Sequence, residues 1–122
     1  MPKLKEARLV EYEIRPWGTF HNIDEGDLFK TKTIKVNPGC RLSRQRHTNR
    51  EEHWIIISGE GIMELNGKEW RVMRGDTIFI DKMDIHRITN DDNEPLVFCE
   101  VQLGVCDEDD IERLEDDYGR IK

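Results

Sequence analysis

The chain has 122 residues, which predicts one domain with a single hydrophobic core. Its 26 acidic residues outnumber 19 basic ones, and the formal net charge of −7 argues against nucleic acid or an anionic membrane as the main partner. No apolar run exceeds four residues, so no membrane span is expected. Three cysteines without CxxC spacing, and no secretory leader, predict a reduced, cytoplasmic protein.

Short strand-like runs separated by turn residues make up most of the sequence. "LFKTKTIKV" predicts a strand over 28–36 that ends at the turn "NPG", and strand-like sequence resumes over 41–47 and 53–58. Residues 62–73 contain Asn66-Gly67, a two-residue turn that predicts a β-hairpin. Further strands are expected over 77–80, 86–90 and 96–103.

About eight short strands at near-regular spacing predict an antiparallel sandwich or barrel, and a jelly roll fits that number. The acidic stretch "DEDDIERLEDDYG" predicts a short C-terminal helix over about 107–118, with Asp107 as its N-cap and Gly119 as the residue that ends it. We therefore expect an all-β fold with a barrel core over about 28–104 and one terminal helix.

The strand predicted over 41–47 has an unusually polar face. Side chains alternate between the two faces of a strand, so one face carries Arg41, Ser43, Gln45 and His47. A strand with so polar a face either turns it to solvent or surrounds a site.

Two residues at the start of later strands, Glu52 and His86, complete a candidate metal site with this face. Together with Gln45 and His47 they offer two imidazoles and two oxygens, a donor set that suits one divalent metal such as zinc, manganese, cobalt, nickel or iron. Isolated histidines are more often surface or satisfied core residues, so spacing alone leaves both interpretations open.

The intervals around these residues resemble the two sequence motifs of the cupin superfamily. Residues 39–59 are similar to G-x5-H-x-H-x4-E-x6-G, with Gln45 at the first histidine, and residues 75–90 are similar to G-x5-P-x-G-x2-H-x3-N. Asp81 and Met83 replace the proline and the second glycine of the latter motif. The resemblance implies a cupin double-stranded β-helix, also called a jelly-roll barrel, and the metal ligands Gln45, His47, Glu52 and His86.

A narrower resemblance covers residues 15–120. "RPWGTF", "RQRHTNREEHWIIISGEG", "PLVFCEVQLG" and "DDIERLEDDYGR" are similar to the cupin domain of type II phosphomannose isomerases, which in many relatives follows a mannose-1-phosphate guanylyltransferase domain. This resemblance implies a metal-dependent isomerase that interconverts mannose 6-phosphate and fructose 6-phosphate through a cis-enediol. The glycine-rich phosphate loop of the transferase is absent from the sequence, so guanylyl transfer is not expected.

Two departures from the family pattern bear on the substrate. Asn49 stands where relatives usually carry a second histidine, and the loop over 105–108 is one residue shorter. Two alternatives therefore stay open: a non-catalytic module that binds metal and sugar phosphate, and a cupin isomerase or other metal cupin enzyme that acts on a different substrate. Gln45 argues against an oxygenase, which usually has more histidines around iron.

An aldose–ketose isomerase needs a base and cations for the phosphate. Glu100 and Gln102 share the strand face beside the expected cavity, which makes Glu100 the candidate base, although a structural carboxylate bonded to an arginine is the alternative. Arg50 is the candidate cation that binds the phosphate or stabilises the enediolate. The remaining substrate-binding candidates are Gln102, on the face of Glu100, and three residues that match the family pattern but could equally be surface residues, Lys32, Arg87 and Arg120.

His53 follows Glu52 on a strand, so its side chain is expected on the opposite face. Trp17 and Trp54 are expected in the core or in the wall of the pocket. The expected partner is a small-molecule sugar phosphate, and cupins of this size commonly pair through edge strands, which predicts a homodimer.

Overall fold

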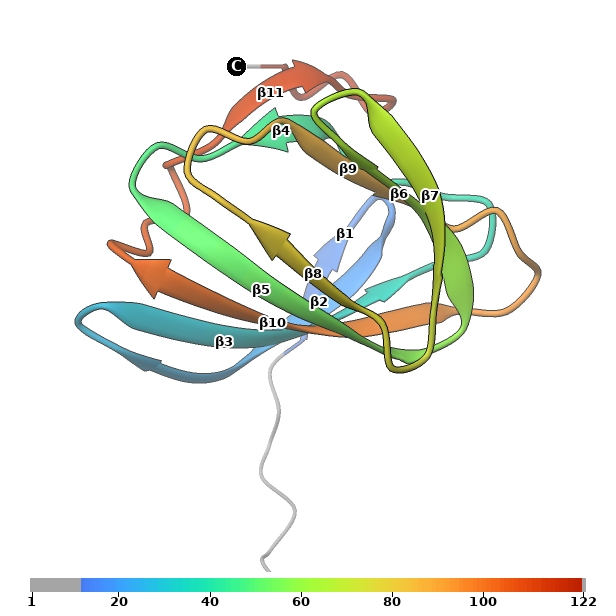
Figure 1. Ribbon diagram of the computed structural model, residues 1–122, viewed down its shortest axis with the longest axis horizontal. Helices are drawn as coiled ribbons and strands as arrows, with labels where there is room; N and C mark the ends of the chain where they lie inside the picture. Colours follow the sequence, from blue (N-terminus) through green and yellow to red (C-terminus); the bar gives the residue numbers. More distant parts are fainter. Residues whose placement is uncertain (1–11, 122) are drawn as a thin grey trace, which may run out of the picture.

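The computed structural model describes residues 12–121, which fold into two antiparallel β-sheets (Figure 1). The six-stranded sheet has the order β1 (Glu13–Arg15), β2 (Gly18–Gly26), β3 (Phe29–Val36), β10 (Leu96–Gly104), β5 (Arg50–Ser58) and β8 (Thr77–Ile80). The five-stranded sheet has the order β11 (Glu112–Glu115), β4 (Arg44–Arg46), β9 (His86–Thr89), β6 (Glu60–Leu65) and β7 (Lys68–Met73).

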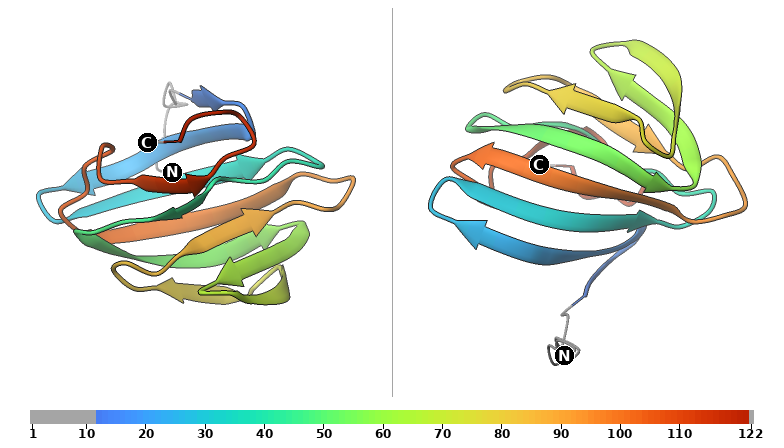
Figure 2. Two further views of the ribbon diagram at one scale, coloured as in Figure 1. Left: turned by 90° about the horizontal axis from the view of Figure 1, so that it is seen from above. Right: turned by 60° about the horizontal axis from the view of Figure 1, so that its bottom comes forward.

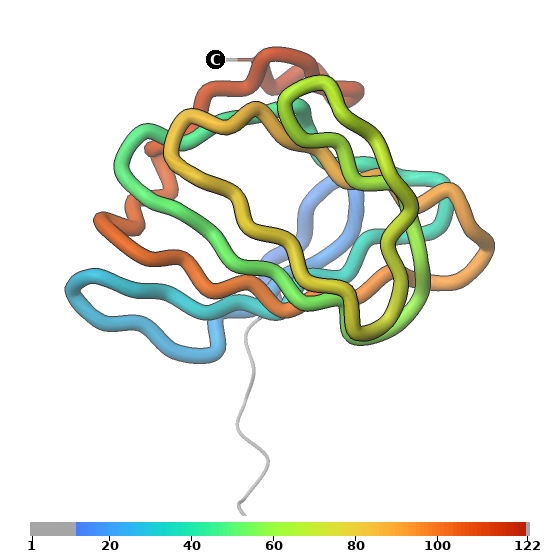
Figure 3. The backbone as a smooth tube through the Cα atoms, in the orientation of Figure 1, coloured from blue at the N-terminus to red at the C-terminus, as the bar shows by residue number. Residues whose placement is uncertain are grey.

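The two sheets face each other and enclose the interior, as the two further views in Figure 2 show. The backbone trace shows β10, in orange, running between β3 and β5, so segments far apart in the sequence lie side by side (Figure 3). The predicted all-β jelly roll is therefore confirmed. The Asn66-Gly67 hairpin is confirmed as well, because both residues have the positive φ angles, 49° and 86°, that a two-residue hairpin turn requires.

The predicted C-terminal helix over 107–118 is wrong. This segment forms turns and the strand β11, which pairs with β4 through Glu112↔Arg46 and Arg113↔Gln45. A helix would spread the acidic side chains around its axis, whereas the extended chain sets them against arginines of the neighbouring strands. The resulting ion pairs join Glu112 to Arg46, Glu115 to Arg44 and Arg87, and Asp117 to Arg41.

The core fills the space between the sheets, because alternate side chains of each strand point inward. Trp54 on β5 stacks on Phe98 of β10 with 4.3 Å between ring centroids, and both side chains are buried. Trp17 is also buried, and both tryptophans line a cavity between the sheets. The expectation that they form core and pocket wall is confirmed.

The outer face of the six-stranded sheet carries exposed apolar side chains, among them Ile55, Ile57 and Phe79. Phe79 belongs to β8, an edge strand of that sheet. The homodimer stays a prediction. In residues 12–121 no helix has the length and apolar character needed to cross a membrane.

Gly59 and Gly67 have similar φ angles but different surroundings, so substituting each by alanine distinguishes backbone strain from steric conflict. Gly59 ends the first cupin-like motif with φ +80°, and a Cβ there would lie 2.3 Å from the carbonyl oxygen of Pro95. Gly67 has φ +86°, and a Cβ there would meet no atom within 4 Å. We expect Gly67→Ala to lower the free energy of unfolding by about 1–2 kcal/mol, the cost of a left-handed backbone, and Gly59→Ala to lower it clearly more.

Urea denaturation of both variants and the wild type measures this difference, provided that the m-values agree. Equal destabilisation by the two substitutions would contradict the close approach of Gly59 to Pro95.

Candidate functional site

A cavity of about 310 Å³ lies between the two sheets. Inward-facing side chains of β3, β5 and β10 line one side of it, and residues of β4, β9 and the C-terminal segment line the other. Its polar and charged lining includes Arg15, Lys32, Gln45, His47, Arg50, Glu52, His86, Glu100, Gln102, Glu108, Arg113 and Arg120. A cavity this polar is expected to bind a charged or strongly polar ligand.

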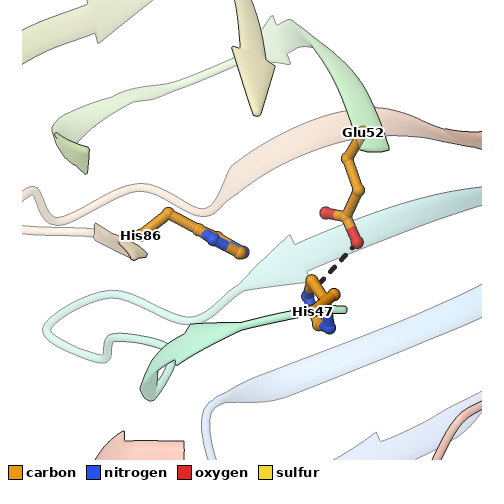
Figure 4. Close-up of side chains that lie close together, drawn as sticks. All are labelled: His47, Glu52 and His86. Atoms are coloured by element: carbon orange, nitrogen blue, oxygen red, sulfur yellow. Dashed lines mark ion pairs between the residues drawn. The ribbon is translucent and has the colours of Figure 1, made fainter. Parts of the chain in front are cut away.

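Three residues of different segments bring their donor atoms together in this cavity. His47 follows β4, Glu52 lies on β5 and His86 begins β9, and one ligand atom from each lies within 4.8 Å of the others. Figure 4 shows the three side chains directed toward a common space, with a dashed line between His47 and Glu52. All three are buried. We call these residues the metal triad.

Backbone carbonyls fix the tautomer of both histidines. Nδ1 of His47 lies 2.7 Å from the carbonyl oxygen of Asp110, and Nδ1 of His86 lies 2.9 Å from that of Asp84. A carbonyl oxygen can only accept, so each Nδ1 carries the proton and each Nε2 presents a lone pair. Nε2 of His86 is buried and has no hydrogen-bond partner among the described residues. This is how metal-binding histidines are held in proteins, so the triad fits a metal ion.

The protonation states suit the same role. Burial lowers the pKa of His47 to about 4, and burial also lowers the pKa of His86. Burial alone would raise the pKa of Glu52, but His47, His86 and Arg50 outweigh it and lower that pKa to about 2. At neutral pH the triad therefore offers two neutral imidazoles and one carboxylate, a donor set for a divalent transition metal or zinc.

Gln45, the fourth ligand expected from the sequence, is buried and lines the same cavity. It pairs with His86 across β4 and β9, so the two residues are held at adjacent positions. Its Nε2 makes only a long hydrogen bond, 3.5 Å, to the carbonyl oxygen of Ser43. The amide is thus placed beside the triad, and its role as a ligand stays a prediction.

Two neighbours hold the carboxylate of Glu52. Nε of Arg50 donates to Oε2 at 2.8 Å, and Nε1 of Trp54 donates to Oε1 at 3.0 Å. A second nitrogen of Arg50 lies 3.4 Å from Nε2 of His47, and a third donates to the carbonyl oxygen of Asp107 at 3.1 Å. These contacts place Arg50, the cation expected from the sequence, directly at the metal triad, and its side chain is buried.

Glu100, the predicted base, is buried on the inward face of β10. It accepts a short hydrogen bond from Gln102 and sits opposite Lys32 of β3 in the sheet register. Burial, followed by the charge of Glu52, raises the pKa of Glu100 to about 8, although Lys32, Gln102 and Arg50 oppose the rise. A carboxyl group with such a pKa can take up and release a proton near neutral pH.

The other substrate-binding candidates divide into two groups. Lys32, Gln102 and Arg120 line the cavity, as expected. Arg87 does not, because it follows His86 on β9 and faces the other side of the sheet. Its Nε donates to the carbonyl oxygen of Leu42 at 2.8 Å and another nitrogen to Glu115 at 3.0 Å, so it anchors β11. His53 is exposed, as expected for the face opposite Glu52.

Sequence reasoning missed the part that the loop before β11 plays in the site. The carboxylate of Asp110 accepts from the backbone N–H groups of Thr48 and Asn49 at 2.9 and 2.8 Å, next to the carbonyl that holds His47. Oε1 of Glu108 accepts from Lys30 and Lys32 at 3.2 and 2.7 Å. Reading the acidic run as a helix hid these contacts, since their partners lie more than sixty residues earlier in the chain.

Comparison with known protein families gives a match over nearly the whole chain. The family model described as "Mannose-6-phosphate isomerase C-terminal" matches residues 4–116. The alginate biosynthesis protein AlgA of Pseudomonas aeruginosa is 44% identical over 107 residues, which cover 87% of this chain and 22% of AlgA. The mannose-1-phosphate guanylyltransferase ManC of Salmonella typhimurium is 38% identical over 108 residues, covering 88% and 22%. The chain thus spans about a fifth of the length of these relatives.

Solved structures agree on the fold. The capsular polysaccharide assembling protein CapF of Staphylococcus aureus superposes with a TM-score of 0.79 at 19% identity, covering 95% of this chain and 37% of CapF. A Klebsiella pneumoniae protein with a double-stranded β-helix domain superposes with a TM-score of 0.70 at 21% identity, covering 79% and 83%. At such identities the likeness establishes a double-stranded β-helix and nothing further.

The metal triad gives a prediction with a matched control. We expect the purified chain to take up one divalent ion, and His47→Ala and His86→Ala to lose it, because each removes one of only a few donors. His53→Ala, which removes an exposed histidine from the other face of β5, should keep the metal. Elemental analysis after dialysis against manganese, cobalt or zinc measures the content. Unchanged metal in His47→Ala would show that the triad is not the site.

Proposed function

Because the chain belongs to the mannose-6-phosphate isomerase C-terminal family of cupins, we propose that it is a metal-dependent sugar-phosphate isomerase that interconverts mannose 6-phosphate and fructose 6-phosphate. The observation that carries the proposal is one cavity that holds a metal triad, a buried cation and a carboxyl group with a raised pKa. Those are the groups that proton transfer between two adjacent carbons of a sugar requires.

Gln45 and the metal triad would hold the metal, which when bound would supply Lewis-acid polarisation of the substrate oxygens. Glu100 in its ionised form takes the proton from C2 of the aldose, which leaves a cis-enediolate with its negative charge on O1. The protonated Glu100 then returns that proton to C1, while the O2 proton moves to O1, and the ketose results. The guanidinium of Arg50 stabilises the negative charge that develops on these oxygens.

The interior position of Glu100 supports this role. Its side chain is buried and bonded to Gln102, so water has little access to the carboxyl group and the abstracted proton stays with it. The nearby carboxylate of Glu52 raises the pKa of Glu100, and a metal ion bound to Glu52 would offset part of that effect. The same carboxyl group can therefore accept and give back a proton within one turnover.

The departure from the family at Asn49 has little bearing on the cavity. Asn49 is exposed and is not among the lining residues, and its backbone N–H donates to Asp110. The shortened loop over 105–108 does reach the site, since Asp107 bonds to Arg50 and Glu108 lines the cavity. This loop favours a second candidate function, isomerisation of a related sugar phosphate with the same chemistry.

A coupled assay for fructose 6-phosphate formation, with added manganese, cobalt or zinc, tests the proposal. We expect turnover by the wild type and a fall in kcat of about 10²–10⁴-fold in Glu100→Gln, the usual contribution of a general base. Glu69→Gln, a substitution of an exposed glutamate on β7, is the matched control and should be fully active.

The pH dependence adds a second readout. The ionised form of Glu100 is the active base, so kcat/KM should rise as the pH increases through the pKa of Glu100 and level off above it. That rise should be absent from the residual activity of Glu100→Gln. If the chain binds the metal and mannose 6-phosphate but gives no turnover with any metal, the isomerase proposal fails and the chain is a binding module.

A further inference from the structure

Two groups of cations lie at or beside the cavity, and carboxylates compensate them differently. Lys30 and Lys32 of β3 both donate to Glu108, so each lysine of this pair contacts a carboxylate. The second group, which we call the arginine cluster, consists of Arg15, Arg113 and Arg120, and all three line the cavity. It joins the end of β1 on one sheet to β11 and the segment after it on the other.

Carboxylates compensate the arginine cluster unevenly. Arg120 makes two hydrogen bonds of 2.9 Å to Asp116, and Arg15 contacts the half-exposed Glu13 at 3.2 Å. Arg113 has no ion pair with any carboxylate of residues 12–121. Its Nε is buried without an acceptor in the described part of the chain, and Nη1 makes only a long bond, 3.4 Å, to the carbonyl oxygen of Arg120.

Such a guanidinium is energetically unfavourable without a counter-charge. Burial lowers the pKa of Arg113, and the charges of Arg120 and Arg15 lower it further against the opposing effect of Asp116. An arginine side chain nevertheless stays protonated in proteins, so it cannot escape by losing its proton. Arg113 is partly buried, so the cost falls on its buried Nε, and an anion from solution would give that N–H an acceptor.

We propose that Arg15, Arg113 and Arg120 form an anion subsite that takes the phosphate group of the substrate. That the anion is a sugar phosphate rests on the proposed function, whereas the affinity for phosphate does not. Guanidinium groups form paired, planar hydrogen bonds to phosphate oxygens, and the unpartnered Nε of Arg113 supplies a donor for one. The lysine pair is less suitable, since a phosphate there would have to displace Glu108.

The aromatic ring of Phe20 contacts one cation of each basic group. The guanidinium of Arg15 lies 4.9 Å from the centre of this ring, and Nζ of Lys32 lies 4.3 Å from it. Lys32 is also the register partner of Glu100, the proposed base. A sugar phosphate anchored at the arginine cluster therefore lies in the same cavity as the base and the metal triad. The subsite would position the substrate without taking part in the proton transfer.

Titration calorimetry with inorganic phosphate, on the full chain in a chelator and without sugar, tests the subsite. We expect the wild type to bind phosphate and Arg113→Met to bind it about tenfold more weakly or worse, the size of one lost hydrogen bond to a charged group. Methionine keeps an unbranched side chain, so the strand should fold, and circular dichroism checks this. Arg71→Met is the matched control: it removes an exposed arginine of β7 that pairs with Asp91, and it should bind phosphate as the wild type does.

Equal phosphate affinity of Arg113→Met and the wild type would overturn the inference, as would no binding by the wild type. Glu108→Gln separates the two basic groups. We expect it to leave the phosphate affinity unchanged, and a clearly tighter affinity would assign the subsite to Lys30 and Lys32 instead. Failure of the isomerase assay leaves this result standing. Conversely, if turnover occurs and Arg113→Met keeps the wild-type KM for the sugar phosphate, the subsite fails and the proposed function stands.

Discussion

The ion pairs between the C-terminal segment and the arginines of β4 and β9 hold the functional half of the molecule together. Exposed ion pairs contribute little singly, but here they act on one short segment, and Arg87 is a buried cation that needs its partner. These pairs place the segment 107–120 along the edge of the five-stranded sheet. Because that segment also reaches into the cavity, its attachment determines the geometry of the whole site.

Each contribution of this segment acts on a residue of another element. The carbonyl of Asp110 sets the tautomer of His47, the carbonyl of Asp107 holds Arg50, and Glu108 accepts hydrogen bonds from the lysines of β3. Arg113 and Arg120 then bring positive charge to the cavity from the same segment. If the segment detached from the sheet, His47 would lose its hydrogen bond, and Arg50 and Lys32 would lose acceptors. The same contacts therefore stabilise the fold and the site.

The sequence predicts well whatever depends on local alternation or on fixed intervals. Alternation placed Gln45 and Glu100 on inward faces, and the cupin-like intervals related His86 to residues forty positions earlier. Local reasoning failed at 107–118, where ion pairs with distant arginines override the helix propensity. It also missed β2, because the outer half of that strand is exposed on both faces and shows no apolar alternation. Whether Arg113 has a carboxylate partner within residues 12–121 depends on which side chains lie nearby in space, and no local pattern encodes that.

The two buried carboxyl groups of the cavity, Glu52 on β5 and Glu100 on the neighbouring strand β10, have different surroundings. Glu52 receives hydrogen bonds from Arg50 and Trp54 and faces two histidines, so it stays ionised and suits a metal. No arginine of residues 12–121 donates to Glu100, and burial together with the charge of Glu52 raises its pKa, so it suits proton transfer. When environments push the pKa values of paired carboxyl groups apart, their roles separate accordingly. The two histidines and then Arg50 lower the pKa of Glu52, and Arg50, which bonds directly to that carboxylate, is itself held by the C-terminal segment.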